Sequence, residues 1–219
     1  MVTNKMPRPR ALAALLVAGG FICGCNADPG IFIRHAATPD PAEQCYAAND
    51  PSGAQIAMGS LDVDLLDTYF ADLVVGNRRT GTSDAVQLYE ASVEVFDSGL
   101  TIDSFTQPVA GFVQPRDGSD FGLGVTRALL LTTPTLAKAL ANHPKGAFEV
   151  VARVFVSGQT LGGSLVTSEP WDFPIIVCDK CVTCQIPAFC DLERPAVCRP
   201  GQDGERPECA TDSAGKTCK

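Results

Sequence analysis

The chain has 219 residues, with 17 Lys or Arg against 25 Asp or Glu, and a formal net charge of −8 at pH 7. This acidic balance argues against nucleic acid as a partner, because binding to phosphate backbones depends on Lys and Arg that displace counterions. It also argues against attachment to an anionic membrane through a basic patch. The length suits one domain of ordinary size with additional segments.

The first 24 residues have the ordered parts of a secretory signal peptide. Lys5, Arg8 and Arg10 form a basic start, and an apolar run follows from Ala11 to Ile22. A membrane-spanning helix needs about 20 apolar residues, so this run is too short to span and suits a cleaved signal. A buried core helix is the alternative, but the basic start and the small residues at the end of the run favour export.

The run ends in Ile22-Cys23-Gly24-Cys25. This order resembles the lipobox of bacterial lipoproteins, in which an aliphatic residue, a small residue and Gly or Ala precede a Cys. The resemblance implies that the Cys25 thiol receives diacylglycerol, that residues 1–24 are removed, and that the new amino group is acylated, with palmitate among the acyl chains. Cys23 departs from the pattern, in which Ala or Ser is more common.

The same resemblance implies a location. In Gram-negative cells, Asp directly after the lipidated Cys tends to retain a lipoprotein at the inner membrane, and Asn26 stands there in this chain. We therefore expect the outer membrane, and the choice between the periplasmic and the surface-exposed leaflet stays open. Stable anchoring takes more than one acyl chain, and a triacylated cysteine meets that condition.

Residues 25–56 are predicted to form a lipid-anchored flexible tether. They are rich in Ala, Pro, Asp, Asn and Gly and show little periodicity. Such a stretch would let a folded domain stand away from the membrane. His35 lies in it and is expected to be solvated.

Residues 57–177 predict a β-sandwich, because short runs rich in Val, Leu, Ile, Phe and Thr are separated by Gly, Pro, Asp and Ser. Within 86–96, Ala91, Val93 and Val95 alternate with polar residues, as in a strand with one face on a core. The other expected strands are 68–77, 108–114, 124–133, 146–158, 163–169 and 173–178. About seven strands are typical of an immunoglobulin-like sandwich, and the lack of a repeated βαβ pattern argues against a Rossmann-like sheet.

One helix is predicted at 133–144, as a crossover between the two sheets. Thr133 can cap its start, Pro134 suits the first helical position, and Pro144 stops it. His143 lies beside its C-terminus, where the helix dipole favours a positive charge, and we expect that role rather than general-base catalysis.

Eight cysteines remain once Cys23 is removed and Cys25 is acylated. They are Cys45, Cys178, Cys181, Cys184, Cys190, Cys198, Cys209 and Cys218. An even number in an oxidising compartment indicates four disulfides, and the sequence does not select among 105 pairings. Since seven of the eight lie beyond residue 177, at least one of these must pair with Cys45 if all are bonded. Residues 178–219 hold few large apolar side chains, so we expect a disulfide-rich tail.

Two other interpretations of the Cys178, Cys181 and Cys184 cluster stay open. Cys-x-x-Cys spacing matches half of a structural zinc site, although such sites are mostly intracellular. A thiol-disulfide redox centre is the second, but a thioredoxin-like motif belongs at a helix start in an alternating strand–helix pattern. Here the cluster follows a strand-like run, so structural disulfides are the leading prediction.

Other candidate chemistry is sparse in the sequence. Gly-x-Ser-x-Gly, P-loop and His-Glu-x-x-His motifs are missing from it. The acidic residues Asp62, Asp64, Asp67 and Asp72, together with Asp117 and Asp120 in a second turn, offer oxygen ligands for calcium, but without EF-hand spacing. Trp171 is expected to fill the core rather than to bind sugar, and Arg78-Arg79 to lie in a solvated turn. We expect no cofactor and no metal.

These observations predict a non-catalytic lipoprotein of the outer membrane, with a sandwich that binds a protein or an envelope polymer or serves a structural role. Residues 153–178 and the cysteines after them are similar to a loose group of Gram-negative cell-envelope lipoproteins, a group that implies fold and location but no activity. The alternatives are a thiol-disulfide redox protein using Cys178, Cys181 or Cys184, and a hydrolase with an unfamiliar site.

Overall fold

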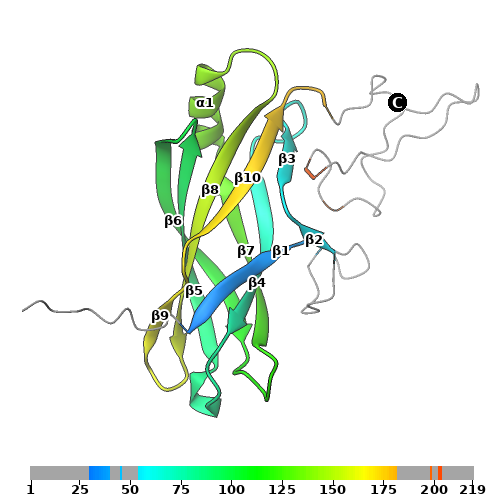
Figure 1. Ribbon diagram of the computed structural model, residues 1–219. Helices are drawn as coiled ribbons and strands as arrows, with labels where there is room; N and C mark the ends of the chain where they lie inside the picture. The colour runs from blue at the N-terminus through cyan, green and yellow to red at the C-terminus, as the bar shows by residue number, and fades with distance from the viewer. Residues whose placement is uncertain (1–29, 40–44, 46–53, 182–197, 199–201, 204–219) are drawn as a thin grey trace, which may run out of the picture.

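The computed structural model describes residues 30–39, 45, 54–181, 198 and 202–203. Two β-sheets pack face to face to form a sandwich (Figure 1). The first sheet has the order β2-β1-β4-β7, and the second has the order β3-β10-β8-β5-β6 with β9 added beside β8. The prediction of a mainly β sandwich with one short crossover helix is confirmed, while the immunoglobulin-like type stays a prediction.

The strands of the first sheet are β1 (Ile31–Ala37), β2 (Gln55–Ile56), β4 (Tyr69–Asn77) and β7 (Gly122–Leu131). Those of the second sheet are β3 (Gly59–Asp62), β5 (Val86–Asp97), β6 (Leu100–Val113), β8 (Phe148–Thr160), β9 (Leu165–Thr167) and β10 (Trp171–Cys178). The pairs are antiparallel except that β3 runs parallel to β10.

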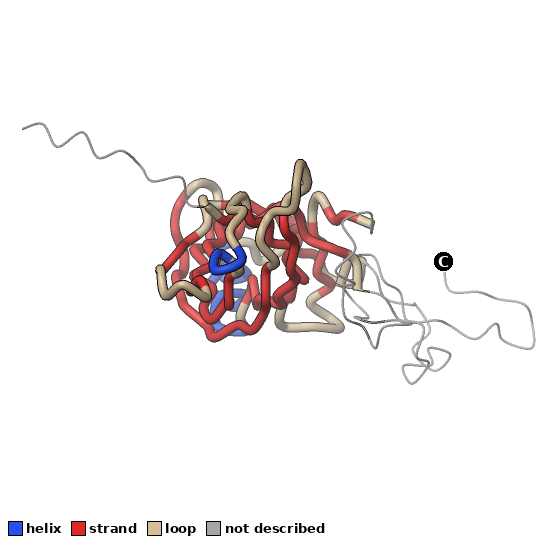
Figure 2. Tube along the Cα trace, turned by 90° about the horizontal axis from the view of Figure 1, so that it is seen from below, coloured by secondary structure: helices blue, strands red, loops and turns tan. Residues whose placement is uncertain are grey.

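The core lies between the sheets and follows the two-residue period of the strands. On β5, Val86 and Leu88 face inward, a bulge at Tyr89 shifts the phase, and Ala91, Val93 and Val95 then face inward. Figure 2 looks along the molecule from its lower end and shows the strands enclosing this interior. Each buried Val or Leu contributes about 1.5–3 kcal/mol relative to exposure, so this alternation stabilises β5 as an inner strand between β8 and β6.

The helix α1 (Thr133–Asn142) joins β7 of the first sheet to β8 of the second, as predicted. The capping residue is Thr132 rather than Thr133, because its side-chain oxygen accepts the backbone N–H of Thr135. His143 is the C-cap residue, and its backbone N–H donates to the carbonyl of Ala139.

The predicted tether at 25–56 is wrong within the described residues. Residues 31–37 form β1, an inner strand that pairs with both β2 and β4, and Ile31, Ile33 and Ala36 belong to the core. The mixture of small and polar residues hid this strand, because a bulge between Ile33 and His35 breaks its alternation. Four residues, 26–29, separate Cys25 from the first described residue.

The long strand β6 also differs from the prediction, which gave it only 108–114. Residues 100–107 extend it along β5. β6 is the edge strand of its sheet, and its side chains are exposed or only partly buried except for Val113 at its end, so its apolar pattern is weak. Pro108 is tolerated there because an edge strand does not need every backbone N–H for pairing.

Two described residues of the C-terminal tail return to the first strands of the sandwich. Gln202 is 1% exposed and its amide bonds both backbone groups of Phe70, accepting the N–H and donating to the carbonyl. Asp203 accepts hydrogen bonds from the Tyr69 hydroxyl, 2.6 Å away, and from the Ser60 backbone N–H. This part of the tail therefore covers the edge that β3 would otherwise expose.

Candidate functional site

A groove of about 710 Å³ lies on the side where β6 and β7, the edge strands of the two sheets, face each other. We call it the β6–β7 groove. It is lined by Phe70, Asp72, Gln107, Pro108, Val109, Ala110, Val125, Thr126, Arg127 and Leu129. The walls are mostly apolar, and the polar side chains are Asp72 of β4, Gln107 of β6, and Thr126 and Arg127 of β7.

An ion pair between Asp72 and Arg127 forms part of the groove. The two residues are direct cross-strand partners on β4 and β7. Arg127 binds the carboxylate with two nitrogens, at 2.7 and 3.1 Å, and also donates to the backbone carbonyl of Cys45. The Asp72 side chain is 1% exposed and that of Arg127 is 35% exposed, so the carboxylate is the more buried member of the pair.

Side chains rather than backbone ladders connect the two edge strands along the groove. The Gln107 amide of β6 donates to the Leu129 carbonyl and accepts the Leu129 backbone N–H. The Thr126 hydroxyl of β7 donates to the carbonyl of Ala110. These bonds hold the groove walls at a fixed spacing, which suits a preformed binding surface better than a gate.

A second hollow of about 690 Å³ lies near the C-terminal end of α1. There the His143 ring, stacked on Phe148, lies 2.8 Å from a carboxylate oxygen of Asp97. Hydrogen bonds from His143 and then from Asn142 hold the pKa of Asp97 below its ordinary value, against the opposing effect of burial. The Ser98 hydroxyl donates to Asp97 rather than to His143, so these three residues do not have the order of a serine-hydrolase triad.

A cross-strand ion pair lines the other side of this hollow. Arg153 binds Asp172 with two nitrogens, at 2.7 and 2.9 Å, and the guanidinium lies over the Phe96 ring. The hydrogen bond from Arg153 lowers the pKa of Asp172. Both side chains are substantially exposed, so the pair orders the strand surface more than it stabilises the fold.

Two disulfides involve described cysteines. Cys45 pairs with Cys198 across 153 residues, so the predicted link from Cys45 to a C-terminal cysteine is confirmed. Cys178 pairs with Cys181, and Cys178, at the end of β10, is 7% exposed with its sulfur against the Leu61 carbonyl. Cys25, Cys184, Cys190, Cys209 and Cys218 lie outside the described residues.

The acidic residues considered for calcium serve other residues instead. Asp62 is fully buried and accepts the backbone N–H groups of Asp64 and Lys180, and Asp67 accepts the Thr133 hydroxyl. Across the described ranges, no group of three or more His, Cys, Asp and Glu side chains could hold a metal ion. The Asp117 and Asp120 backbones pair with each other across their turn.

The prediction that His35 is solvated is wrong. The side chain is 6% exposed, and neither ring nitrogen has a hydrogen-bond partner. Burial, and then the positive charge of Arg34, lower its pKa. A bulge between Ile33 and His35 changes which side chains of β1 point inward. The His35 side chain is therefore packed against the protein and not exposed to solvent.

The side chains of Trp171, Arg78 and Arg79 all make contacts with other residues of the protein. Trp171 is partly buried against the core and stacks on Phe173, in agreement with the predicted core role. The Arg78 guanidinium lies over the Phe32 ring, and Arg79 pairs with Asp84 at 4.0 Å. The expectation of a simply solvated turn is therefore wrong for these arginines.

The groove and its ion pair were not predicted from the sequence. Opposite charges inside two neighbouring apolar runs, Asp72 in 68–77 and Arg127 in 124–133, are the signal that could have indicated them. That signal needs the strand order, since cross-strand partners must be adjacent and in register.

The chain matches no protein-family model and no curated protein. Among solved structures, it is similar to a late embryogenesis abundant (LEA) protein whose structure was determined in solution. The match has 15% sequence identity and a TM-score of 0.34, and it covers 55% of this chain and 69% of the LEA protein. Among the described residues, no helix is long and apolar enough to cross a membrane.

Proposed function

We propose that this protein is a lipoprotein anchored in the outer membrane through Cys25, with a sandwich that acts as a non-catalytic binding or structural module of the cell envelope. The observation that carries the proposal is the ordered signal ending in Ile22-Cys23-Gly24-Cys25. The acyl chains supply the membrane affinity that the acidic chain, with its charge of −8, lacks.

The two disulfides support an oxidising compartment, in which such bonds persist. The link between Cys45 and Cys198 joins a residue near the start of the sandwich to one in the C-terminal tail.

The β6–β7 groove is the surface that we assign to a partner. Its occupant on this proposal is an extended segment of a partner protein, with apolar side chains against Phe70 and Val109 and a carbonyl or carboxylate facing Arg127. The Arg127 side chain, 35% exposed, carries the positive charge at the groove, and the NH groups of a guanidinium donate hydrogen bonds but accept none.

Membrane attachment is tested by mass spectrometry and fractionation of the full chain. A polypeptide that begins at Cys25 and carries three acyl chains is expected, and Cys25→Ser should move the protein from the membrane pellet to the soluble fraction. A Cys23→Ser variant is the matched control and should stay in the pellet. Retention of Cys25→Ser in the pellet would refute anchoring through this residue.

The groove is tested separately with a photoreactive amino acid at Phe70, which is 38% exposed and lines it. Tyr89 is 44% exposed and lies outside the groove, so it serves as the control position. A discrete crosslinked protein is expected from position 70 alone, and Arg127→Ala should abolish that product. Equal yields at the two positions, or a product insensitive to Arg127→Ala, would exclude the groove as the binding surface.

A further inference from the structure

The position of Gly30 places one end of the sandwich close to residue 25. Five Cα–Cα steps separate the two residues, and a fully extended chain covers at most about 3.3–3.6 Å per residue. Gly30 therefore lies within about 18 Å of Cys25, whatever path the intervening chain takes. With an acylated Cys25 at the membrane surface, the end of the sandwich that carries Gly30 is the end nearest to the lipid.

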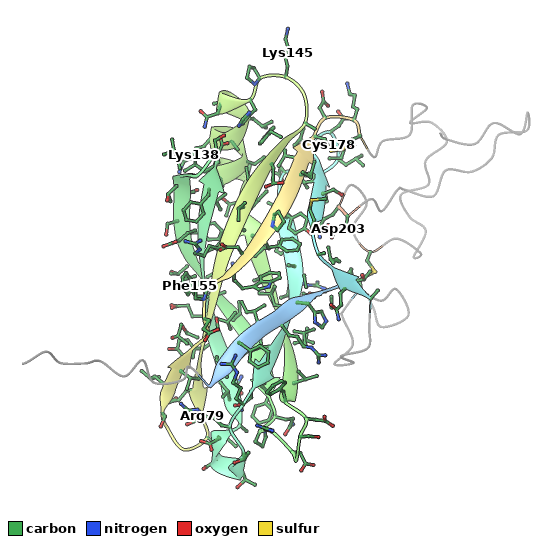
Figure 3. All side chains as sticks on the ribbon, in the orientation of Figure 1. Arg79, Lys138, Lys145, Phe155, Cys178 and Asp203 are labelled. Carbon is green, nitrogen blue, oxygen red and sulfur yellow. A yellow bond between two sulfur atoms is a disulfide. The ribbon has the colours of Figure 1, made fainter. Side chains whose placement is uncertain are left out.

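Three loops gather at this end, which we call the Gly30 end. The Gly30 carbonyl accepts the Arg78 backbone N–H at 2.7 Å, and the Arg79 carbonyl accepts the Arg116 N–H. The hairpin that joins β8 to β9 docks onto the same loop, since Leu161 donates to Ala85 and Gly162 to Ser83. In Figure 3, Arg79 marks this end, and Lys145 and Cys178 lie toward the opposite one.

The β8–β9 hairpin presents two leucines at its tip. Leu161 is 64% exposed and Leu165 is 72% exposed, and they flank the turn residues Gly162 and Gly163. Tip positions of hairpins are normally polar, because a leucine that contacts only water gains nothing from its side chain. Both leucines project from a hairpin held by backbone hydrogen bonds, so their exposure is a fixed property of the fold.

Arginine and aromatic side chains surround the same end. Arg78 lies over the Phe32 ring and Arg116 lies over the Phe121 ring. The two phenyl rings pack edge to face, with their centroids 5.1 Å apart. Phe121 is 43% exposed. Arginines with aromatic and aliphatic neighbours are typical of the headgroup boundary of a bilayer, where charged and apolar groups are accommodated together.

We propose that the Gly30 end rests on the lipid surface and that Leu161 and Leu165 insert into its headgroup region. The inference rests on the lipidation of Cys25 in the proposed function and goes beyond it, since a lipid anchor alone would leave the sandwich free to turn. With this orientation the strands stand along the membrane normal. α1 and the Cys178 end of β10 then lie at the end of the sandwich away from the membrane (Figure 1).

The test uses the full chain in its native membrane, with a photoreactive benzoylphenylalanine in place of Leu161, Leu165 or Leu100 in turn. Leu100 is 72% exposed, as is Leu165, but it follows the β5–β6 turn at the end near α1, so it is the matched control. Irradiation should attach phospholipid at positions 161 and 165 in at least about tenfold higher yield than at position 100.

The outcomes separate the orientation from the anchoring. If the intact mass shows an acylated Cys25 but lipid adducts form equally at the three positions, the orientation is wrong and the anchoring stands. A protein adduct at 161 or 165 in place of a lipid adduct also overturns the orientation. An intact mass without acyl chains refutes the anchoring, whatever the adducts show.

Discussion

Replacing Arg127 by Leu removes the guanidinium that binds Asp72 and leaves a 1% exposed carboxylate without its cationic partner. The loss of one partner from a fully buried ion pair costs about 3–5 kcal/mol, chiefly because the other charge remains desolvated. The Arg127 side chain is 35% exposed, so solvent already screens part of the interaction. We therefore expect Arg127→Leu to lower the free energy of unfolding by about 2–3 kcal/mol.

The double variant Asp72→Leu/Arg127→Leu is expected to recover most of this loss. Apolar replacement of both members of a buried pair is often neutral, because neither charge is then left desolvated. Phe70 and Leu129 line the same groove and offer apolar contacts to the new side chains. Urea denaturation at pH 7, followed by circular dichroism, measures the unfolding free energies of the wild type, the two single variants and the double variant.

Arg153→Leu is the matched control, since Arg153 and Asp172 are also cross-strand partners with a two-nitrogen contact, but both are exposed. It should change the unfolding free energy far less than Arg127→Leu does. Equal effects of the two substitutions would refute the argument from burial. A double variant as unstable as Arg127→Leu would show that lost packing, and not an unpaired charge, explains the cost.

Three further predictions concern stability. Replacing Cys45 and Cys198 by Ser should lower the unfolding free energy by up to about 5 kcal/mol in the chain-entropy model, since the bond spans 153 residues, and urea denaturation under oxidising conditions measures it. The pKa of His35 is lowered in the folded protein. Its contribution to the free energy of unfolding is therefore complete above the ordinary pKa of 6.5 and is lost as the pH falls through the lowered pKa. His35→Leu should flatten that decline, and an equally steep decline in the variant would contradict the assignment. The pKa of Asp97 is also lowered, chiefly by its hydrogen bond with His143. The contribution of Asp97 to the free energy of unfolding is therefore present above its ordinary pKa of 3.8 and is lost in stronger acid. Asp97→Asn should cost about 1.5–3 kcal/mol at pH 6 and progressively less as the pH falls toward 2, and a cost independent of pH would contradict the pairing.

Local patterns in the sequence were sufficient for several elements. The alternation of Val and Ala with Glu and Ser in 86–96 predicted β5, and the run at 146–158 predicted β8. Pro134 and Pro144 bracketed the helix, whose observed end at Asn142 lies two residues before Pro144. In each case the decisive residues are close together along the chain, so propensity and periodicity report the structure directly.

β1 and β6 show why other elements were missed or shortened. β1 is stabilised by its neighbours on both sides, and its bulge at residues 33–35 erases the two-residue period by which strands are recognised. β6 pairs with β5 over its whole length but lies at an edge, and before Val113 its side chains are exposed or only partly buried, so few of them had to be apolar. Tertiary pairing decided both.

The candidate site depends on tertiary structure to a still greater degree. Asp72 and Arg127 are 55 residues apart, and they meet because β4 and β7 are neighbours in a register that sets them opposite each other. Gln202 reaches Phe70 across 132 residues in the same way. Such contacts follow from the global packing that buries the core, and no local preference of either residue encodes them.

The sequence by itself determined the broad class of the protein: an acidic, cysteine-rich chain whose first residues resemble a lipoprotein signal and whose body alternates like the strands of a sandwich. Only the tertiary structure decided that the sandwich begins at β1, within a few residues of Cys25, and that Leu161 and Leu165 share that end. The physical reason is that composition and periodicity act over a few residues. The groove, and the position of the exposed hairpin beside the start of β1, depend instead on how distant strands pair.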